Sequence, residues 1–192
     1  MECTALKGRG ANPLKPRPAR VRSRGLTLIE AAMVLAILAL VVAGIMQFYS
    51  QANMSRQTTA ALGELASVQQ NIRSLYDGQA SYAGMTTALI AKSKALPAKM
   101  VNGVTLRHSF NGAIDIAAAN AGGGWNSGFQ VEFENVPQKA CIKMLSYDYG
   151  RGLYAMGVGS ASRTQTDGLP YTLAAATAAC SAANDDVVWI FS

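Results

Sequence analysis

Few side chains in the 192-residue chain could do chemistry, and they lie far apart in the sequence. The only histidine, His108, is followed directly by Ser109. Adjacent residues seldom form a working nucleophile and base, so we expect His108 to lie at the surface or in a turn. The glycines at 122–124 are not followed by Lys and Ser or Thr, which excludes a phosphate-binding P-loop and favours a turn before a strand. We therefore expect no catalytic residue, no cofactor and no enzymatic activity.

Two other features each allow two interpretations. Trp125 directly follows the glycines, and it is either an exposed adhesive contact or, as is usual for a tryptophan in a small domain, part of the core. The pair Asp185 and Asp186 could bind a cation, although a solvated turn is the favoured interpretation.

The three cysteines divide into one near the N-terminus, Cys3, and a pair, Cys141 and Cys180. If the pair lies outside the cytoplasm, it predicts one disulfide. Closing a loop of roughly 40 residues would stabilise the fold by about 4 kcal/mol on the chain-entropy estimate. Two separate buried thiols are the alternative. A metal site is disfavoured, because His108 is the only histidine and no CxxC or HxxxH spacing occurs.

The positive net charge of +6 is confined to the N-terminal segment. Residues 1–25 contain seven Lys and Arg and one acid, which leaves ten bases and ten acids in the rest of the chain. The excess therefore does not predict direct nucleic-acid binding. It indicates a segment that stays on the cytoplasmic side of a membrane.

An apolar run follows at residues 26–49, and its only charged residue is Glu30. Its length suffices to span a bilayer. A secretory signal peptide would be cut after the run, where no convincing Ala-x-Ala site follows. An ordinary membrane anchor fits the length but gives no reason for Glu30, since a carboxylate inside a membrane costs about 3 kcal/mol unless it has a partner.

A short motif between the basic segment and the apolar helix resembles the processing site of bacterial type IV prepilins. Its sequence is Arg24-Gly25-Leu26-Thr27-Leu28-Ile29-Glu30. The resemblance implies that a prepilin peptidase cuts after Gly25 and methylates the new amine of Leu26. It also implies that Glu30 of an incoming subunit pairs with the amine of a docked neighbour. Opposite charges about 4 Å apart are worth about 4 kcal/mol at an effective dielectric of 20. A Glu30 that merely reaches the membrane surface is the alternative.

No proline occurs between Pro18 and Pro97, so one helix can continue past the membrane, from about Thr27 to Tyr76. Polar residues, Glu64 among them, occupy much of its second half. Apolar residues recur there at steps of three and four, as on one helix face: Leu62, Leu65, Val68, Ile72 and Leu75. We therefore divide the chain into a leader (1–25), a membrane and filament-core helix (26–49), an amphipathic stem (50–77) and a globular head (78–192).

The head combines helical and alternating patterns. Helices are expected at residues 86–95 and 137–147, and strands at 113–116, 129–133, 153–158 and 187–191. The last strand is nearly all apolar, so it should be central or covered. The predicted fold is α+β, with a long N-terminal helix packed on an antiparallel sheet.

The long leader, and Leu26 rather than Phe after the cut, are similar to the type IVb pilins. Four stretches resemble the PilS-type pilins in particular: residues 76–82, 96–100, 110–113 and 136–141. The resemblance implies a major pilus subunit that polymerises with itself for adhesion or conjugative DNA transfer. Its partners would be the peptidase, an assembly platform and an ATPase, and it would pass from the inner membrane to an extracellular pilus. The alternatives are a minor pilin or tip adhesin, or a type II secretion pseudopilin.

Overall fold

The structure is a computed structural model that describes residues 27–192, so Cys3, Gly25 and Leu26 lie outside the described residues. The four α-helices are α1 (Leu28–Leu75), α2 (Thr87–Lys92), α3 (Gln138–Leu145) and α4 (Leu173–Ala179). The strands are β1 (Val101–Asn102), β2 (Thr105–Arg107), β3 (Ala113–Ala119), β4 (Gly128–Pro137), β5 (Leu153–Val158), β6 (Ala161–Thr164) and β7 (Asn184–Phe191). The chain divides into two compact units between Gly44 and Ile45.

Helix α1 begins with a hydrogen-bonded cap. The hydroxyl of Thr27 accepts a hydrogen bond from the backbone N–H of Glu30 at 3.3 Å. A threonine before the helix and a glutamate three residues later are typical helix-start residues, and the negative charge also favours the positive end of the helix dipole. Glu30 thus fits the first turn of α1 whatever its other role.

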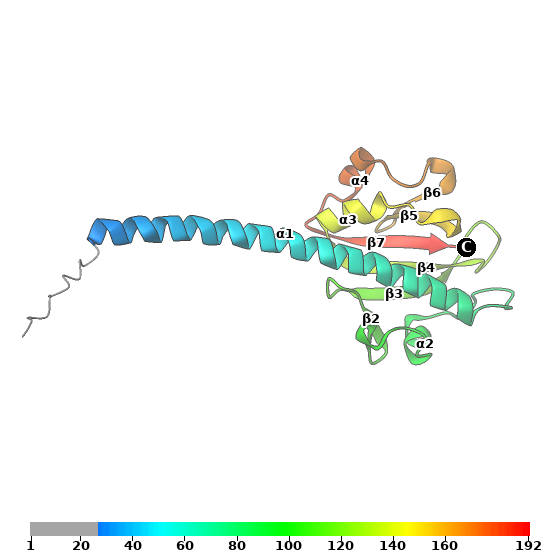
Figure 1. Ribbon diagram of the computed structural model, residues 1–192. Helices are drawn as coiled ribbons and strands as arrows, with labels where there is room; N and C mark the ends of the chain where they lie inside the picture. The colour runs from blue at the N-terminus through cyan, green and yellow to red at the C-terminus, as the bar shows by residue number, and fades with distance from the viewer. Residues whose placement is uncertain (1–26) are drawn as a thin grey trace, which may run out of the picture. The chain divides into compact units, whose positions relative to one another are not determined.

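The C-terminal part of α1 lies across one face of the sheet (Figure 1). The predicted stripe is confirmed at its centre, where Leu65, Val68 and Ile72 are fully buried. Its edges differ from the prediction, because Leu62 is only partly buried and Leu75 is exposed. The buried face is instead extended by small and polar residues, which are Thr58, Ala61 and Glu64.

The seven strands form one antiparallel sheet in the order β1-β2-β3-β4-β7-β5-β6. Strand β7 pairs with β4 on one side and β5 on the other, so the apolar C-terminal strand is central, as predicted. The other three predicted strands and both predicted helices are also present. Strands β1, β2 and β6, which are two to four residues long, and helix α4 were not predicted.

The core lies between the sheet and the helices. On β4, every second side chain faces inward: Phe129, Val131 and Phe133 are fully buried, while Glu132 between them is only partly buried. On β7, Val187, Trp189 and Phe191 are fully buried, and Val188, which lies between two of them on the opposite face, is buried as well. The period-two pattern of β4 places one face of this central strand in the core, while the side chains on its other face are only partly buried.

Helices α3 and α4 are joined by the predicted disulfide between Cys141 and Cys180. The amide of Gln138, the first residue of α3, adds a hydrogen bond of 2.9 Å to the carbonyl of Cys180. Both cysteines are fully buried. The disulfide thus connects the helix after β4 to the segment that leads into β7.

Replacing both cysteines by serine is expected to lower the free energy of unfolding by about 2–5 kcal/mol, because the unfolded chain regains the freedom of the open loop. The measurement is denaturant unfolding of the full chain in detergent. The matched control is Cys3→Ser, which leaves the disulfide intact and should unfold like the wild type. Equal stability of the double variant and this control would contradict the prediction.

Candidate functional site

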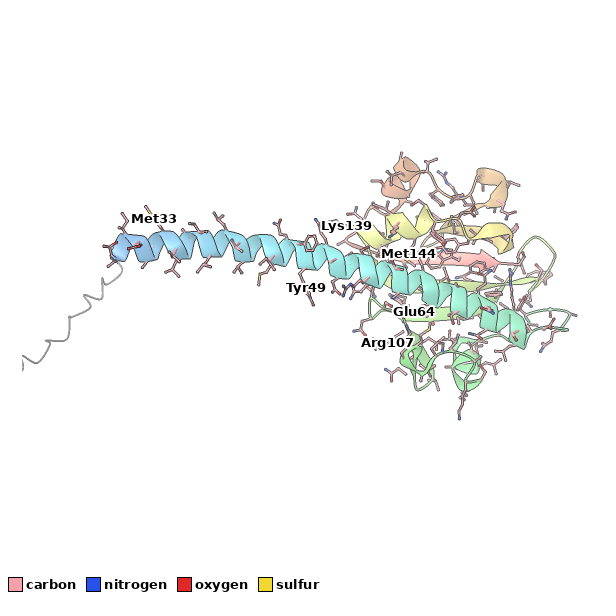
Figure 2. The ribbon with its side chains drawn as sticks, in the orientation of Figure 1. Met33, Tyr49, Glu64, Arg107, Lys139 and Met144 are labelled. Atoms are coloured by element: carbon pink, nitrogen blue, oxygen red, sulfur yellow. A yellow bond between two sulfur atoms is a disulfide. The ribbon has the colours of Figure 1, made fainter. Side chains whose placement is uncertain are left out.

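The N-terminal part of α1 presents large apolar side chains on all sides. Between residues 28 and 49, fourteen of them are exposed, among them Met33 and Tyr49 (Figure 2). Glu30 is the only charged residue in this segment. By length and composition α1 can cross a membrane. Each exposed side chain of this size would gain about 2 kcal/mol on leaving water, so the segment requires an apolar environment.

Glu64 is buried in the face of α1 that packs on the head, with only 6% of its surface exposed. Its carboxylate accepts hydrogen bonds from the N–H and the hydroxyl of Ser109, at 2.9 and 2.8 Å, and from the ammonium of Lys99 at 3.1 Å. Glu64, which the sequence groups with the polar residues outside the apolar stripe, therefore belongs to the buried face of α1. A buried carboxylate is tolerated when several donors satisfy its oxygens, and here three do.

His108 is buried directly beside this carboxylate, at 4% exposure, which corrects the expectation of a surface histidine. Its ring stacks on Phe133 with the centroids 4.8 Å apart. It does lie in the turn between β2 and β3, where Nδ1 accepts from the N–H of Phe110 at 3.2 Å and Nε2 lies 2.8 Å from the carbonyl oxygen of Glu134. Because an N–H points at Nδ1, the proton belongs on Nε2, and the ring is held as one neutral tautomer.

This neutral state agrees with the direction in which the pKa of His108 is displaced. Burial lowers it, against the smaller raising effects of the Glu134 carbonyl and the Glu64 carboxylate. Gly112 has no side chain where a Cβ would overlap the Glu134 carbonyl and reach the ring. His108 is thus a packed structural residue, and its neighbour Ser109 is occupied by Glu64.

The two consecutive aspartates near the C-terminus lie in β7, not in a solvated turn. Asp185 is buried, and among the described residues its Oδ2 has no hydrogen-bond partner. A carboxylate oxygen of Asp185 and the two cysteine sulfurs lie within 4.8 Å of one another. Those sulfurs form the disulfide and have no thiolate to offer, so this cluster does not fit a metal ion. Asp186 is exposed and accepts the N–H of Asn135 at 2.9 Å.

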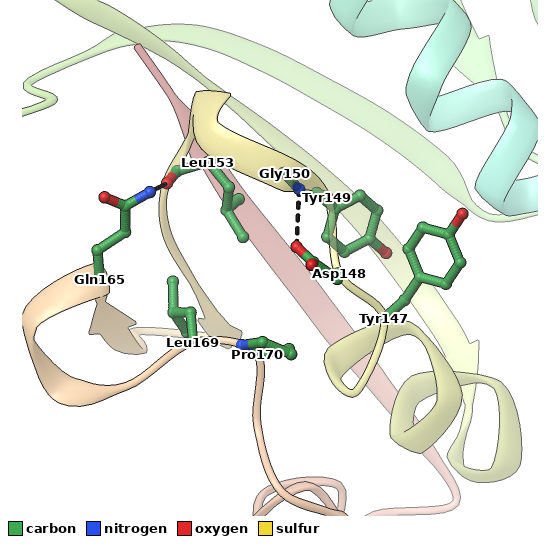
Figure 3. Close-up of a pocket in the computed structure, with 8 residues that line it drawn as sticks. All are labelled: Tyr147, Asp148, Tyr149, Gly150, Leu153, Gln165, Leu169 and Pro170. Carbon is green, nitrogen blue, oxygen red and sulfur yellow. Dashed lines mark hydrogen bonds between the residues drawn. The ribbon is translucent and has the colours of Figure 1, made fainter.

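A cavity of about 250 Å³ lies between the segment after α3 and the segment before α4 (Figure 3). Its polar side chains are used in local hydrogen bonds: Asp148 accepts the N–H of Gly150 at 2.8 Å, and Gln165 donates to the carbonyl of Leu153 at 2.5 Å. Burial raises the pKa of Tyr149, whose hydroxyl donates to the carbonyl of Met144 at 3.1 Å. The lining contains no base next to a nucleophile.

Solved structures show the same fold. The fold is similar to that of the type IVb pilin from Salmonella typhi, with a TM-score of 0.54 at 22% identity over 67% of this chain and 95% of that chain. It is also similar to TcpA, a type IV pilin from Vibrio cholerae El Tor biotype, with a TM-score of 0.51 at 14% identity over 71% of this chain and 99% of that one. A long apolar helix whose second half packs on an antiparallel sheet is the type IV pilin fold.

The family model described as PilS N terminal matches residues 55–192. The chain is 30% identical over 141 residues to the major structural subunit of bundle-forming pilus from Escherichia coli O111:H-, which is 72% of each protein. It is 31% identical over 137 residues to the subunit of the same description from Escherichia coli O127:H6, which is 70% of each. The chain therefore belongs to the PilS family of type IVb pilins.

The predicted site residues fall in three places. Gly25 and Leu26 lie outside the described residues, Glu30 lies in the first turn of α1, and Cys141 is bonded to Cys180. The cluster around Glu64 was missed. Its signal was present, because Glu64 is three residues after Ala61 and four before Val68, which places a charge inside the apolar stripe.

Glu64→Ala is expected to lower the free energy of unfolding by about 2–3 kcal/mol, because the buried donors of Ser109 lose their acceptor. Lys99→Ala is the matched comparison. The side chain of Lys99 is 66% exposed, so its loss should cost less than about 1 kcal/mol. Denaturant unfolding of the two variants measures the difference, and equal losses would show that the ion pair, not the serine contacts, stabilises this cluster.

The stability of the head is expected to fall as the pH drops below about 6.5, because the unfolded histidine binds a proton more readily than the folded one. The contribution of His108 is fully present above its unfolded pKa and is lost as the pH falls toward the lower folded value. Unfolding of wild type and His108→Gln between pH 7.5 and 5 measures this difference. Glu132, whose pKa is raised by burial and then by nearby acids, acts in the opposite direction in both proteins and cancels in the comparison. A constant difference across this range would contradict the prediction.

Proposed function

We propose that this chain is the major structural subunit of a type IVb pilus. It polymerises through its N-terminal helix into a thin extracellular filament used for adhesion or conjugative DNA transfer. The observation that carries the proposal is the apolar segment of α1, exposed from Leu28 to Tyr49 and charged only at Glu30. In the membrane lipid covers this surface, and in the filament neighbouring helices replace the lipid.

The proposed maturation assigns a role to each part of the chain. Residues 1–25 are a cytoplasmic leader, 26–49 the membrane and filament-core helix, 50–77 the stem, and 78–192 the displayed head. A prepilin peptidase removes the leader after Gly25 and methylates Leu26 in the inner membrane. An assembly platform driven by an ATPase then moves the subunit into the filament. The chain itself carries out no reaction and takes no cofactor.

Glu30 sets the position of each subunit in this proposal. Its carboxylate pairs with the amine of Leu26 in a neighbour, and the attraction of about 4 kcal/mol is lost in any other stagger. The Thr27 cap already places Glu30 in the first turn of α1. Its charge therefore lies at the end of the helix where the new amine is formed.

A minor pilin, a tip adhesin or a type II secretion pseudopilin is the alternative for the same N-terminal design. The relatives named major structural subunits of bundle-forming pilus, which this chain matches over about seven tenths of its length, favour the major subunit. The number of copies of this chain in purified filaments distinguishes a major subunit from a minor one.

Glu30→Gln is expected to abolish filaments, because it removes the charge while keeping an amide of nearly the same shape. The measurement is the yield of filaments sheared from cells, together with the intact mass of the subunit. Mature wild-type and variant chains should both lack residues 1–25, which separates a failure of assembly from a failure of processing.

Thr27→Ala is the matched control. It removes the helix cap, worth about 1 kcal/mol, but keeps the carboxylate, so filaments should still form. Normal filaments from Glu30→Gln would overturn the role of the charge. An uncut chain, or one cut after the apolar segment, would overturn the pilin maturation.

A further inference from the structure

The two tryptophans of the head have opposite environments. Trp189 on β7 is fully buried in the core, whereas Trp125, in the loop between β3 and β4, is 87% exposed. The expectation that Trp125 belongs to the core is therefore wrong, and the alternative of an exposed contact fits. An indole ring is the largest apolar side chain, so leaving it in water forgoes substantial burial energy.

The loop holds this exposed position by its own hydrogen bonds. The hydroxyl of Ser127 accepts the N–H groups of Ala121 and Gly123, at 2.9 and 3.3 Å. The side-chain oxygen of Asn120 accepts the N–H of Asn126 at 2.9 Å, and the carbonyl of Asn126 accepts the N–H of Tyr82 at 2.9 Å. The loop is thus held at Gly123, two residues before Trp125, and at Asn126, directly after it.

A shallow cavity of about 380 Å³ lies beside the ring. Its lining consists of Asn120, Gly122, Gly124, Trp125 and Tyr154. Gly122 lies against the Tyr154 ring, where a Cβ would come within 3.0 Å of a ring carbon, and its φ of +79° also favours glycine. The cavity is therefore lined by two aromatic residues, Trp125 from the loop and Tyr154 from β5, and by one amide residue, Asn120.

We propose that this cavity binds a neutral saccharide. One face of a pyranose ring carries only C–H groups, which match the electron-rich face of an aromatic ring, while its hydroxyls bind amides and phenols. The amide nitrogen of Asn120 and the hydroxyl of Tyr154 supply those polar partners, since the oxygen of Asn120 is already occupied by Asn126. The lining residues that the structure describes include no lysine, arginine or acid, which disfavours phosphate, sialic acid and charged peptides.

The site stands on the geometry of the head alone. Its use in adhesion rests on the proposed function, because only a filament displays many copies at once. A single shallow site binds weakly, and repetition along a filament raises the effective affinity of a multivalent surface.

The experiment uses the full chain in a zwitterionic detergent without a sugar headgroup. The probes are the methyl glycosides of galactose, glucose and N-acetylglucosamine, with sialic acid as the charged comparison. They are added up to about 50 mM, well above the Kd of about 1 mM expected for a shallow site. Acrylamide quenching of tryptophan fluorescence reports contact, because Trp125 is exposed to the quencher and Trp189 serves as a buried internal reference.

At least one neutral glycoside should halve the quenching of the exposed tryptophan, and sialic acid should not. Saturation-transfer NMR on variants then identifies the site: Trp125→Ala should abolish the signal and Tyr154→Phe should weaken it several-fold. Leu173→Ala, which truncates an exposed apolar residue on α4, should leave the signal unchanged.

The proposal is overturned if no neutral glycoside protects the exposed tryptophan from acrylamide. It is also overturned if the saturation-transfer NMR signal persists in Trp125→Ala. The yield of filaments from Trp125→Ala separates this proposal from the pilus function. Normal filaments that lack saccharide binding support the site. Loss of filaments would assign Trp125 to a contact between subunits and overturn the use of the site in adhesion, while leaving the pilus function intact.

Discussion

An apolar helix surface that cannot remain in water is the constraint on which this protein depends. The N-terminal part of α1 exposes apolar side chains on every side, so no single packing face is distinguished from another. Burial against one partner helix would leave the opposite face in water. Only an environment that surrounds the helix, lipid or several neighbouring helices, satisfies it. The sole charge, on Glu30, then becomes the one feature that distinguishes one axial position from another.

The same helix has to meet a different requirement in its second half, where it must stay fixed to the head. Apolar contacts by Leu65, Val68 and Ile72 supply most of the burial but little direction. The carboxylate of Glu64 adds direction, because its oxygens bind donors from two separate segments, at Lys99 and Ser109. A rotation or slide of α1 would leave a buried charge without partners, which costs more than lost apolar contact. The cluster therefore fixes the register of the stem on the head, as Glu30 is proposed to do between subunits.

The sequence predicts those parts of the fold that depend on strong local periodicity. The long helix, the four longer strands and helix α3 follow from such patterns, and the central place of β7 follows from its uninterrupted apolar residues. Strands β1, β2 and β6 are too short to show a period and exist through pairing with their neighbours. The burial of His108 and Glu64 was missed for a related reason. The partners that allow these two residues to be buried include groups distant in the sequence, as Ser109 is from Glu64, whereas residue type alone predicts the surface.

Trp125 shows where a general rule fails for a physical reason that can be traced. A tryptophan is normally buried because burial gains more than any single loop contact, yet the loop from Asn120 to Ser127 is bonded at both ends and has glycines on the way. Gly124 has a φ of +114°, a conformation that other residues rarely adopt, so the backbone before Trp125 turns in a way that few sequences permit. The core does not lack an indole, because Trp189 already packs against Phe133 with the ring centroids 5.3 Å apart. Exposure of the second indole is thus maintained by several independent features of the loop, an arrangement better explained by a ligand than by chance.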